Sequence, residues 1–290
     1  MFNKRGNFVV CNSYTVENDW LEVINDVTSG RNFKAALFDF DGTLSLIREG
    51  WQDVMIPYFC EEFKSSLPCR SENDAEINEL VTSFVNSLTG KQTIFQCQQL
   101  KIEIEKRGGV AKEAMYYKNE YLRRLYLRIE SRRRGLCDGS VKPEDFLVKG
   151  SSDILSALLS KGINIYCASG TDQPQVREEA GFLGLDRYFG ENIYGALDEH
   201  AEQCSKEVVI NRLLKEKNIK GSELLSFGDG FVEIELVKNV GGYAVAVATD
   251  EKNRNGVDAD KRERLLKAGA DAVIPDFENT EILMAHLFNE

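Results

Sequence analysis

The sequence predicts an α/β protein with a parallel sheet, helices packed on that sheet, and an all-helical segment inserted after the first core strand. Two patterns predict it. From about residue 150 onward, short apolar runs alternate with segments of helical periodicity, which is typical of repeated strand-helix units. Residues 46–147, by contrast, are helix-like and contain no evident buried strand.

The N-terminal residues 1–33 are predicted to form an extension packed on this core. Within it, residues 8–10 have the apolar character of an edge strand, and residues 20–24 are predicted as a short helix. We assign this extension no function. The first core strand is expected at residues 35–39. This run is short and apolar, and a glycine-containing turn follows it.

The inserted segment, residues 46–147, is expected to form a helical cap over the end of the first strand. A loop of that length is implausible inside a compact domain, whereas a separate helical subdomain accounts for it. Four helix-like stretches support this assignment, at residues 51–63, 77–88, 94–104 and 111–129.

The α/β core is predicted to combine residues 34–45 with residues 148–290. A helix that Ser151 or Ser152 can cap and that Gly162 can end leads into the second core strand. Together with the first strand the sheet then has at least five members, the later ones being residues 163–168, 224–227, 243–248 and 271–274.

Composition narrows the class of protein. The 290 residues are 42% hydrophobic and 29% charged, as in soluble globular proteins, and the net charge of -11 argues against nucleic-acid or anionic-membrane partners. The seven cysteines are scattered without a Cys-x-x-Cys pair, so neither a disulfide framework nor a zinc knuckle is indicated. The start of the chain lacks the apolar run of a signal peptide, and we expect a soluble cytoplasmic protein.

Asp39 and Asp41 are the most informative pair of residues. Side chains two apart in a strand point the same way, so these carboxylates are expected to converge at the carboxyl end of the first strand, where open α/β sheets bind ligands. Their repulsion would be relieved by a bound cation. The alternative is an ordinary Asp-Gly turn beside a strand-end cap.

Three later sites can complete a phosphate centre. Ser169 and Gly170 follow a predicted strand, where a hydroxyl and turn amides can hold phosphate oxygens, although Ser-Gly-Thr is also simply a good turn. Lys206 begins a predicted helix, an end at which the helix dipole favours negative charge. A bound anion would explain a lysine there, although a solvated surface lysine is the simpler interpretation. Asp229 can be a metal ligand or a helix N-cap, and Glu233 can orient the site or begin a solvated helix face.

In this order, the motifs resemble those of the haloacid-dehalogenase-like superfamily. The resemblance rests on Asp39-Phe40-Asp41-Gly42-Thr43-Leu44, Ala168-Ser169-Gly170-Thr171, Lys206, and Gly228-Asp229-Gly230 followed by Glu233. It implies a Rossmann-like parallel sheet core with helices on both faces, plus an all-helical cap inserted between the first two motifs. The family's last motif often carries Asp where this chain has Glu233, so the resemblance leaves open whether Glu233 reaches a metal directly or through water.

The resemblance also implies roles for individual residues. Asp39 would be the nucleophile and Asp41 the general acid and base. Ser169, Gly170 and Lys206 would bind phosphate, with Thr43 and Glu233 in support. Mg²⁺ would be held by Asp39, by the backbone carbonyl of Asp41 and by Asp229.

The implied activity is Mg²⁺-dependent hydrolysis of a small phosphorylated metabolite. Dehalogenase members lack an acid at the second position, so Asp41 favours phosphoryl transfer. A sugar phosphomutase of the same superfamily and a non-catalytic regulatory relative are the alternatives. The sequence makes no prediction of oligomeric state.

The cap is expected to select the substrate. Arg48 lies close behind the catalytic turn and is the first choice for a substrate contact, followed by Glu49, Trp51 and Tyr117. Most of the arginines at residues 123–134 are expected to face solvent, because Arg124 and Arg128 lie opposite the apolar face of their helix.

Overall fold

A computed structural model describes residues 15–17, 20–28, 31–67, 72–197 and 205–289. Its strands form an eight-stranded sheet in the order β1-β2-β8-β7-β6-β3-β4-β5. The strands β3 to β8 run parallel, and β2 joins them antiparallel to β8 with β1 outside it. The strand bounds are β1 Thr15–Glu17, β2 Leu21–Val23, β3 Ala35–Phe38, β4 Asn164–Asp172, β5 Ile193–Ala196, β6 Leu224–Gly228, β7 Tyr243–Val247 and β8 Ala272–Ile274.

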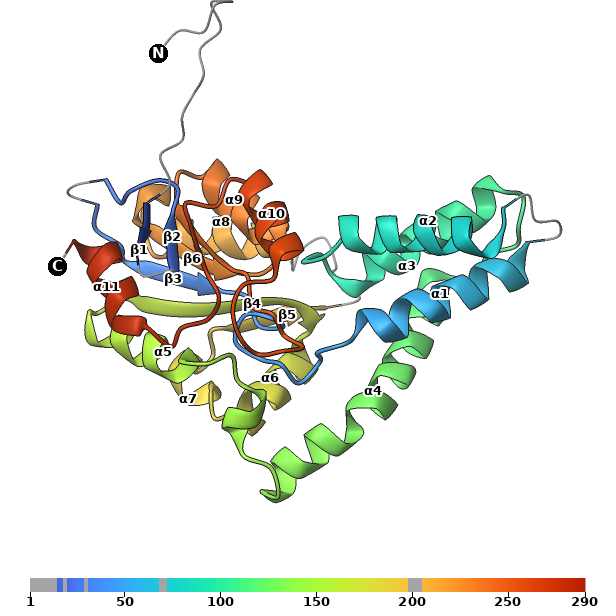
Figure 1. Cartoon of the computed structure of the whole chain (residues 1–290), viewed down its shortest axis with the longest axis horizontal. Helices are drawn as coiled ribbons and strands as arrows, with labels where there is room; N and C mark the ends of the chain where they lie inside the picture. Colours follow the sequence, from blue (N-terminus) through green and yellow to red (C-terminus); the bar gives the residue numbers. More distant parts are fainter. Residues whose placement is uncertain (1–14, 18–19, 29–30, 68–71, 198–204, 290) are drawn as a thin grey trace, which may run out of the picture.

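Helices cover both faces of the sheet, which confirms the predicted fold class (Figure 1). Alternate residues of the central strands point to opposite faces: Phe38 packs in one apolar core and Leu37 in the other. One face carries α5 Ser151–Ser160, α6 Gln173–Phe182, α7 Asp186–Phe189 and α11 Thr280–Phe288. The other carries α8 Lys206–Glu216, α9 Phe231–Asn239 and α10 Ala259–Lys267.

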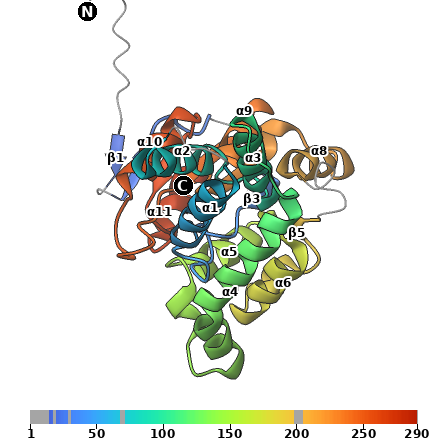
Figure 2. The same ribbon diagram turned by 90° about the vertical axis from the view of Figure 1, so that its right-hand side faces the viewer.

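A second group of helices extends from the carboxyl ends of the parallel strands (Figures 1 and 2). All of them lie inside the segment predicted as a cap, and the boundaries at residues 45 and 147 stay a prediction. The group consists of α1 Gln52–Ser66, α2 Asp74–Ser87, α3 Thr93–Lys106 and α4 Ala114–Asp138. The last helix continues beyond the predicted residue 129 and ends where Gly139 adopts φ 74°.

The helical group is tied to the core by polar contacts. Lys118 of α4 is buried and lies 2.6 Å from the Asp172 carboxylate at the end of β4. Arg132 donates to the carbonyls of Ile47 and Glu49, at 2.9 and 3.0 Å. Arg132 therefore holds the connection between the first strand and the helices, in contrast to the solvent-facing position expected of this run of arginines.

The predicted short helix at residues 20–24 is wrong. Leu21 to Val23 instead form β2, in which the first and last side chains are buried and the middle one is partly exposed. Five residues are too few to nucleate a stable helix, whereas the open edge of β8 offers backbone partners. The edge strand expected at residues 8–10 lies outside the described part of the chain.

Two local predictions after residue 148 also need correction. Neither Ser151 nor Ser152 caps α5, since the N-cap is Gly150 with φ 72°, and a Cβ there would lie 2.1 Å from the Phe277 carbonyl oxygen. The Ser169-Gly170-Thr171 segment was expected to form a turn after its strand, yet it lies within β4. Pairing with β5 resumes at Asp172 and Ala196 after an irregularity that begins at Ala168.

Within the described ranges, no helix is both long and apolar enough to cross a membrane. Four cysteines in those ranges are free thiols, namely Cys60, Cys97, Cys137 and Cys167.

Candidate active site

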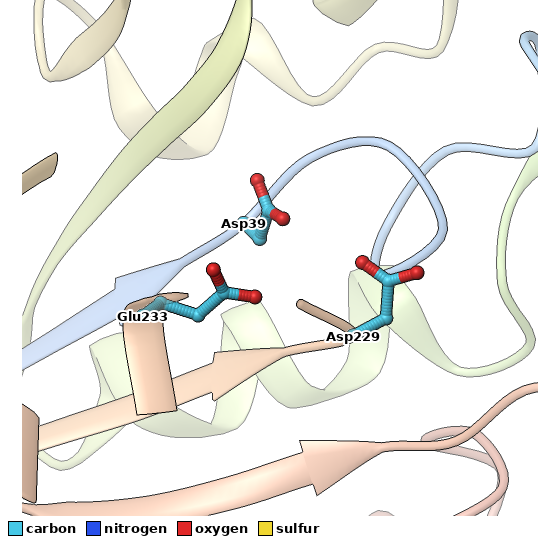
Figure 3. Close-up of side chains that lie close together, drawn as sticks. All are labelled: Asp39, Asp229 and Glu233. Atoms are coloured by element: carbon cyan, nitrogen blue, oxygen red, sulfur yellow. The ribbon is translucent and has the colours of Figure 1, made fainter. Parts of the chain in front are cut away.

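Three carboxylates meet at the carboxyl edge of the sheet (Figure 3). Asp39 follows β3, Asp229 follows β6, and Glu233 lies in the first turn of α9. One oxygen atom from each lies within 4.8 Å of the other two, and all three residues are buried. Hard divalent cations prefer such oxygen ligands, so these residues fit the predicted Mg²⁺.

Lys206 is the cation of this cluster. Its ammonium nitrogen lies 2.9 Å from Asp39 Oδ2 and 2.8 Å from Glu233 Oε2. Burial lowers the pKa of Lys206, but the charges of Asp39 and Glu233 more than reverse this, so the pKa stays above its ordinary value. The first residue of α8 is therefore a buried ammonium that faces the predicted nucleophile, and it is not a solvated surface lysine.

Burial also affects Asp39, the predicted nucleophile. It raises the pKa of Asp39 well above the ordinary value, and Lys206 opposes that rise only in part. The Asp39 carboxylate accepts the Phe40 amide hydrogen through Oδ1 at 2.8 Å. Its orientation is thus fixed by one backbone donor and one ammonium group.

Glu233 has both oxygens engaged. Oε1 accepts the Gly230 amide hydrogen at 2.6 Å, at the start of α9, and Oε2 accepts from Lys206 at 2.8 Å. A side chain at Gly228 would place its Cβ 2.3 Å from Glu233 Oε1. The glycine therefore leaves space for the longer carboxylate to fold back toward the cluster.

Asp41 lies beside this cluster and is held by the second motif. Thr171 Oγ1 donates to Asp41 Oδ2 at 2.7 Å, and Ser169 Oγ lies 3.5 Å from the same oxygen. Burial raises the pKa of Asp41 to about 6, with the nearby Arg48 guanidinium opposing part of the rise. A carboxyl group with this pKa can both donate and accept a proton near neutral pH.

We expect Asp41→Asn to stabilise the metal-free protein at neutral pH by about 2 kcal/mol. A rise from 3.8 to about 6 corresponds to about 3 kcal/mol at 1.36 kcal/mol per pKa unit, and we discount this because 26% of the side chain is exposed. The folded protein favours protonated Asp41. The stability that this protonation contributes to the wild type is fully present below pH 3.8 and is lost as the pH rises through about 6. The stability of Asp41→Asn relative to the wild type should therefore increase between pH 3.8 and about 6.

Urea unfolding in EDTA at about pH 4.5 and about pH 7.5 measures this difference. Asp53→Asn is the control, because the Asp53 side chain is 70% exposed. The same stability difference at both pH values would contradict the prediction.

Arg48 forms a buried ion pair behind Asp41. Its Nε and Nη2 donate to the two carboxylate oxygens of Glu179 on α6, both at 2.9 Å, and its Nε lies 3.8 Å from Asp41 Oδ1. Burial lowers the pKa of Arg48, and the charges of Glu179 and Asp41 raise it above the ordinary value. Arg48 therefore adds a fixed positive charge beside the predicted acid and base.

A cavity of about 90 Å³ opens where the helical group faces these residues. The core contributes Asp39, Asp41, Ser169, Gly170, Thr171 and Asp229, and the helical segment contributes Arg48, Trp51, Thr89, Gly90, Lys91, Thr93, Gln96 and Tyr121.

The structure brings most of the predicted site residues together. Arg48 and Trp51 line the cavity, whereas Glu49 and Tyr117 do not: Glu49 pairs with Arg132 at 2.9 Å, and the buried Tyr117 accepts the Lys112 amide hydrogen. Thr43 is buried, and its hydroxyl has no hydrogen-bond partner within the described residues. Its backbone amide donates to the Phe40 carbonyl at 3.3 Å.

Gly170 has a second role that the sequence does not reveal. A Cβ at this position would lie 2.7 Å from the carbonyl oxygen of Lys91, in the loop between α2 and α3. The glycine thus lets the helical segment approach the second motif. Three further polar residues near the site carry no local sequence signal, and these are Glu179, Glu251 and Lys261.

The comparisons with known proteins agree with this geometry. A model of the haloacid dehalogenase-like hydrolase family matches residues 33–241. A comparison with curated proteins yields no match.

Several solved structures share the fold. A haloacid dehalogenase-like protein of unknown function from Agrobacterium tumefaciens is 16% identical, with a TM-score of 0.56, and the match covers 89% of this chain and 100% of that one. A predicted phosphoglycolate phosphatase from Haemophilus somnus is 16% identical (TM-score 0.55, 87% and 98% covered). A β-phosphoglucomutase from Clostridium difficile is 15% identical (TM-score 0.59, 89% and 98% covered). At these identities the likeness shows the fold alone.

Proposed function

The chain belongs to the haloacid dehalogenase-like hydrolase family, and from this premise we propose that it is a Mg²⁺-dependent phosphatase of a small phosphorylated metabolite. The observation that carries the proposal is the arrangement of acids at the carboxyl edge of the sheet. Asp39 lies with Asp229 and Glu233 in a cluster suited to a divalent cation, and Asp41, whose pKa is raised to about 6, opens onto the same cavity.

The chemistry follows from the charges of these groups. A phosphate monoester is a dianion, so an uncompensated carboxylate would repel it. Asp39, Asp229 and the Asp41 carbonyl would hold Mg²⁺, which when bound would supply the charge neutralisation that the approach of carboxylate and phosphate requires. Lys206 and the Ser169 hydroxyl then hold the equatorial phosphate oxygens, aided by the backbone at Gly170.

Asp39 attacks phosphorus and the bond to the leaving oxygen breaks, which gives an aspartyl-phosphate. Protonated Asp41 gives its proton to the leaving oxygen in this step. In the second step ionised Asp41 takes a proton from water as the water attacks phosphorus, which frees Asp39 and inorganic phosphate. Asp41 returns to its protonated form, and Thr171 holds its carboxylate in place throughout.

We infer that the segment 46–147 acts as a cap that selects the substrate. Its share of the cavity lining combines hydroxyl, amide, aromatic and cationic groups around a small volume. Such a lining suits a compact polar leaving group better than a large apolar one.

The test is a screen of small phosphate monoesters with Mg²⁺ or with EDTA, with separate measurement of inorganic phosphate and of the organic product. We expect Mg²⁺-dependent phosphate release in equal amounts with the dephosphorylated product. An isomeric phosphate ester without phosphate release would instead identify a mutase. Failure to release phosphate from any ester, with the folded protein and Mg²⁺ present, would favour the non-catalytic alternative.

A further inference from the structure

Asp229 has a charged partner that lies outside the sequence motifs. Lys261, from α10, places its ammonium nitrogen 3.0 Å from Asp229 Oδ2. The lysine is 9% exposed at its side chain, and the aspartate 12%. One of the two oxygens of a predicted metal ligand is thus already bound by a buried cation of the chain itself.

Lys261 is held in this position from two sides. Its ammonium also lies 2.8 Å from Glu251 Oε1, in the loop between β7 and α10. The Asp258 side chain accepts the Lys261 amide hydrogen at 2.7 Å, which fixes the start of the helix. Burial lowers the pKa of Lys261, but the charges of Asp229 and Glu251 more than compensate, so the group remains an ammonium ion.

The catalytic turn leaves room for this arrangement. Gly42 has φ 77°, and a Cβ there would lie 2.3 Å from Asp229 Oδ2 and 3.0 Å from Glu251 Oε1. Both carboxylates therefore pack directly against the backbone of the turn that follows Asp41. Asp229 Oδ2 is enclosed by this turn and the ammonium, which leaves Oδ1 for a cation.

We propose that Lys261 is a specificity-determining residue for the metal, because it restricts Asp229 to coordination through one oxygen and thereby favours Mg²⁺ over Ca²⁺. The inference rests on the proposed Mg²⁺ site. Lys261 acts through Asp229 and touches neither substrate nor metal, so it is a positioning residue. Glu251 in turn positions Lys261.

The physical reason lies in the coordination chemistry of the two ions. Mg²⁺ demands near-octahedral geometry, with one oxygen from each carboxylate and several retained waters. Ca²⁺ accepts six to eight oxygens and readily takes both oxygens of one carboxylate. Removing the ammonium strengthens the attraction for both divalent ions alike, whereas only Ca²⁺ can use the oxygen that is released.

The experiment measures Mg²⁺ and Ca²⁺ binding to the full chain by isothermal titration calorimetry, with no substrate present. In Lys261→Met we expect the ratio of the Ca²⁺ Kd to the Mg²⁺ Kd to fall at least about fivefold below that of the wild type. Lys261→Arg, which keeps a cation beside Asp229, should stay closer to the wild-type ratio. Lys267→Met is the matched control, because Lys267 is on the same helix with 74% of its side chain exposed.

Lys261→Met also leaves Glu251 without its cation and can weaken the fold. The double variant Lys261→Met/Glu251→Gln removes that unpaired charge and should show the same fall in the ratio. Ratios within about twofold of wild type in both variants would overturn the inference while the wild type still binds Mg²⁺. A wild type that binds neither ion would overturn the metal assignment as well, whereas absence of phosphatase activity would leave the binding ratios intact.

Discussion

Asp39→Asn is expected to abolish turnover while leaving the fold in place. The amide cannot attack phosphorus, and the loss of a nucleophile should lower kcat by at least about 10⁴-fold, or about 5.5 kcal/mol at 1.36 kcal/mol per factor of ten. Stability should change by no more than about 1 kcal/mol, because Lys206 keeps Glu233 as a buried partner. Phosphate release with the substrate found in the screen, together with urea unfolding, measures both quantities.

Asp74→Asn is the control for this variant. Asp74 is on α2, outside the cavity, and its side chain is 71% exposed. We expect this control to retain wild-type turnover. Substantial activity in a folded Asp39→Asn protein would refute the nucleophile assignment, and unfolding of the variant would show that Asp39 is mainly structural.

The sequence predicted the part of the site that lies in short local motifs. Asp39, Ser169 and Asp229 follow core strands or lie at their carboxyl ends, and parallel strands bring those ends to one edge of the sheet. Hydrophobic runs also identified the core strands, because strands buried on both faces are apolar throughout. Weakly patterned elements were harder: β5 was not predicted, and β2 was predicted as a helix.

The remaining parts of the site depend on tertiary contacts between residues far apart in the chain. Arg48 meets Glu179 across 131 positions, and Lys261 meets Asp229 from a later helix. A lone glutamate or lysine on a helix has the same local pattern whether it faces solvent or a buried partner. For Glu233, a place at the start of a helix was predicted, but the contact with Lys206 was not.

Three buried cations beside the candidate site explain how its acids share one edge of the sheet. Lys206 lies between Asp39 and Glu233, Lys261 between Asp229 and Glu251, and Arg48 between Glu179 and Asp41. Each cation has two carboxylates, so the cluster retains excess negative charge. That excess is what a divalent cation can neutralise, which supports the proposed Mg²⁺ requirement.

Lys206→Met is expected to have the second large effect, on both stability and activity. The variant leaves Asp39 and Glu233 buried and close together without a cation, and breaking such a pair costs about 3–5 kcal/mol. Without the ammonium, the two carboxylates repel each other when both are ionised, so the destabilisation should be larger at about pH 8 than at about pH 5, where protonation relieves the repulsion. Urea unfolding at the two pH values measures this dependence.

The double variant Lys206→Met/Glu233→Gln separates the structural role of Lys206 from its role in phosphate binding. The glutamine removes one of the two uncompensated charges, and its Oε1 can still accept the Gly230 amide hydrogen that caps α9. Most of the lost stability should therefore return, whereas kcat/KM should stay about 10²–10³-fold below wild type, because the charge opposite the phosphate oxygens is still missing. If activity returned together with stability, Lys206 would serve only to neutralise Asp39 and Glu233 in the fold.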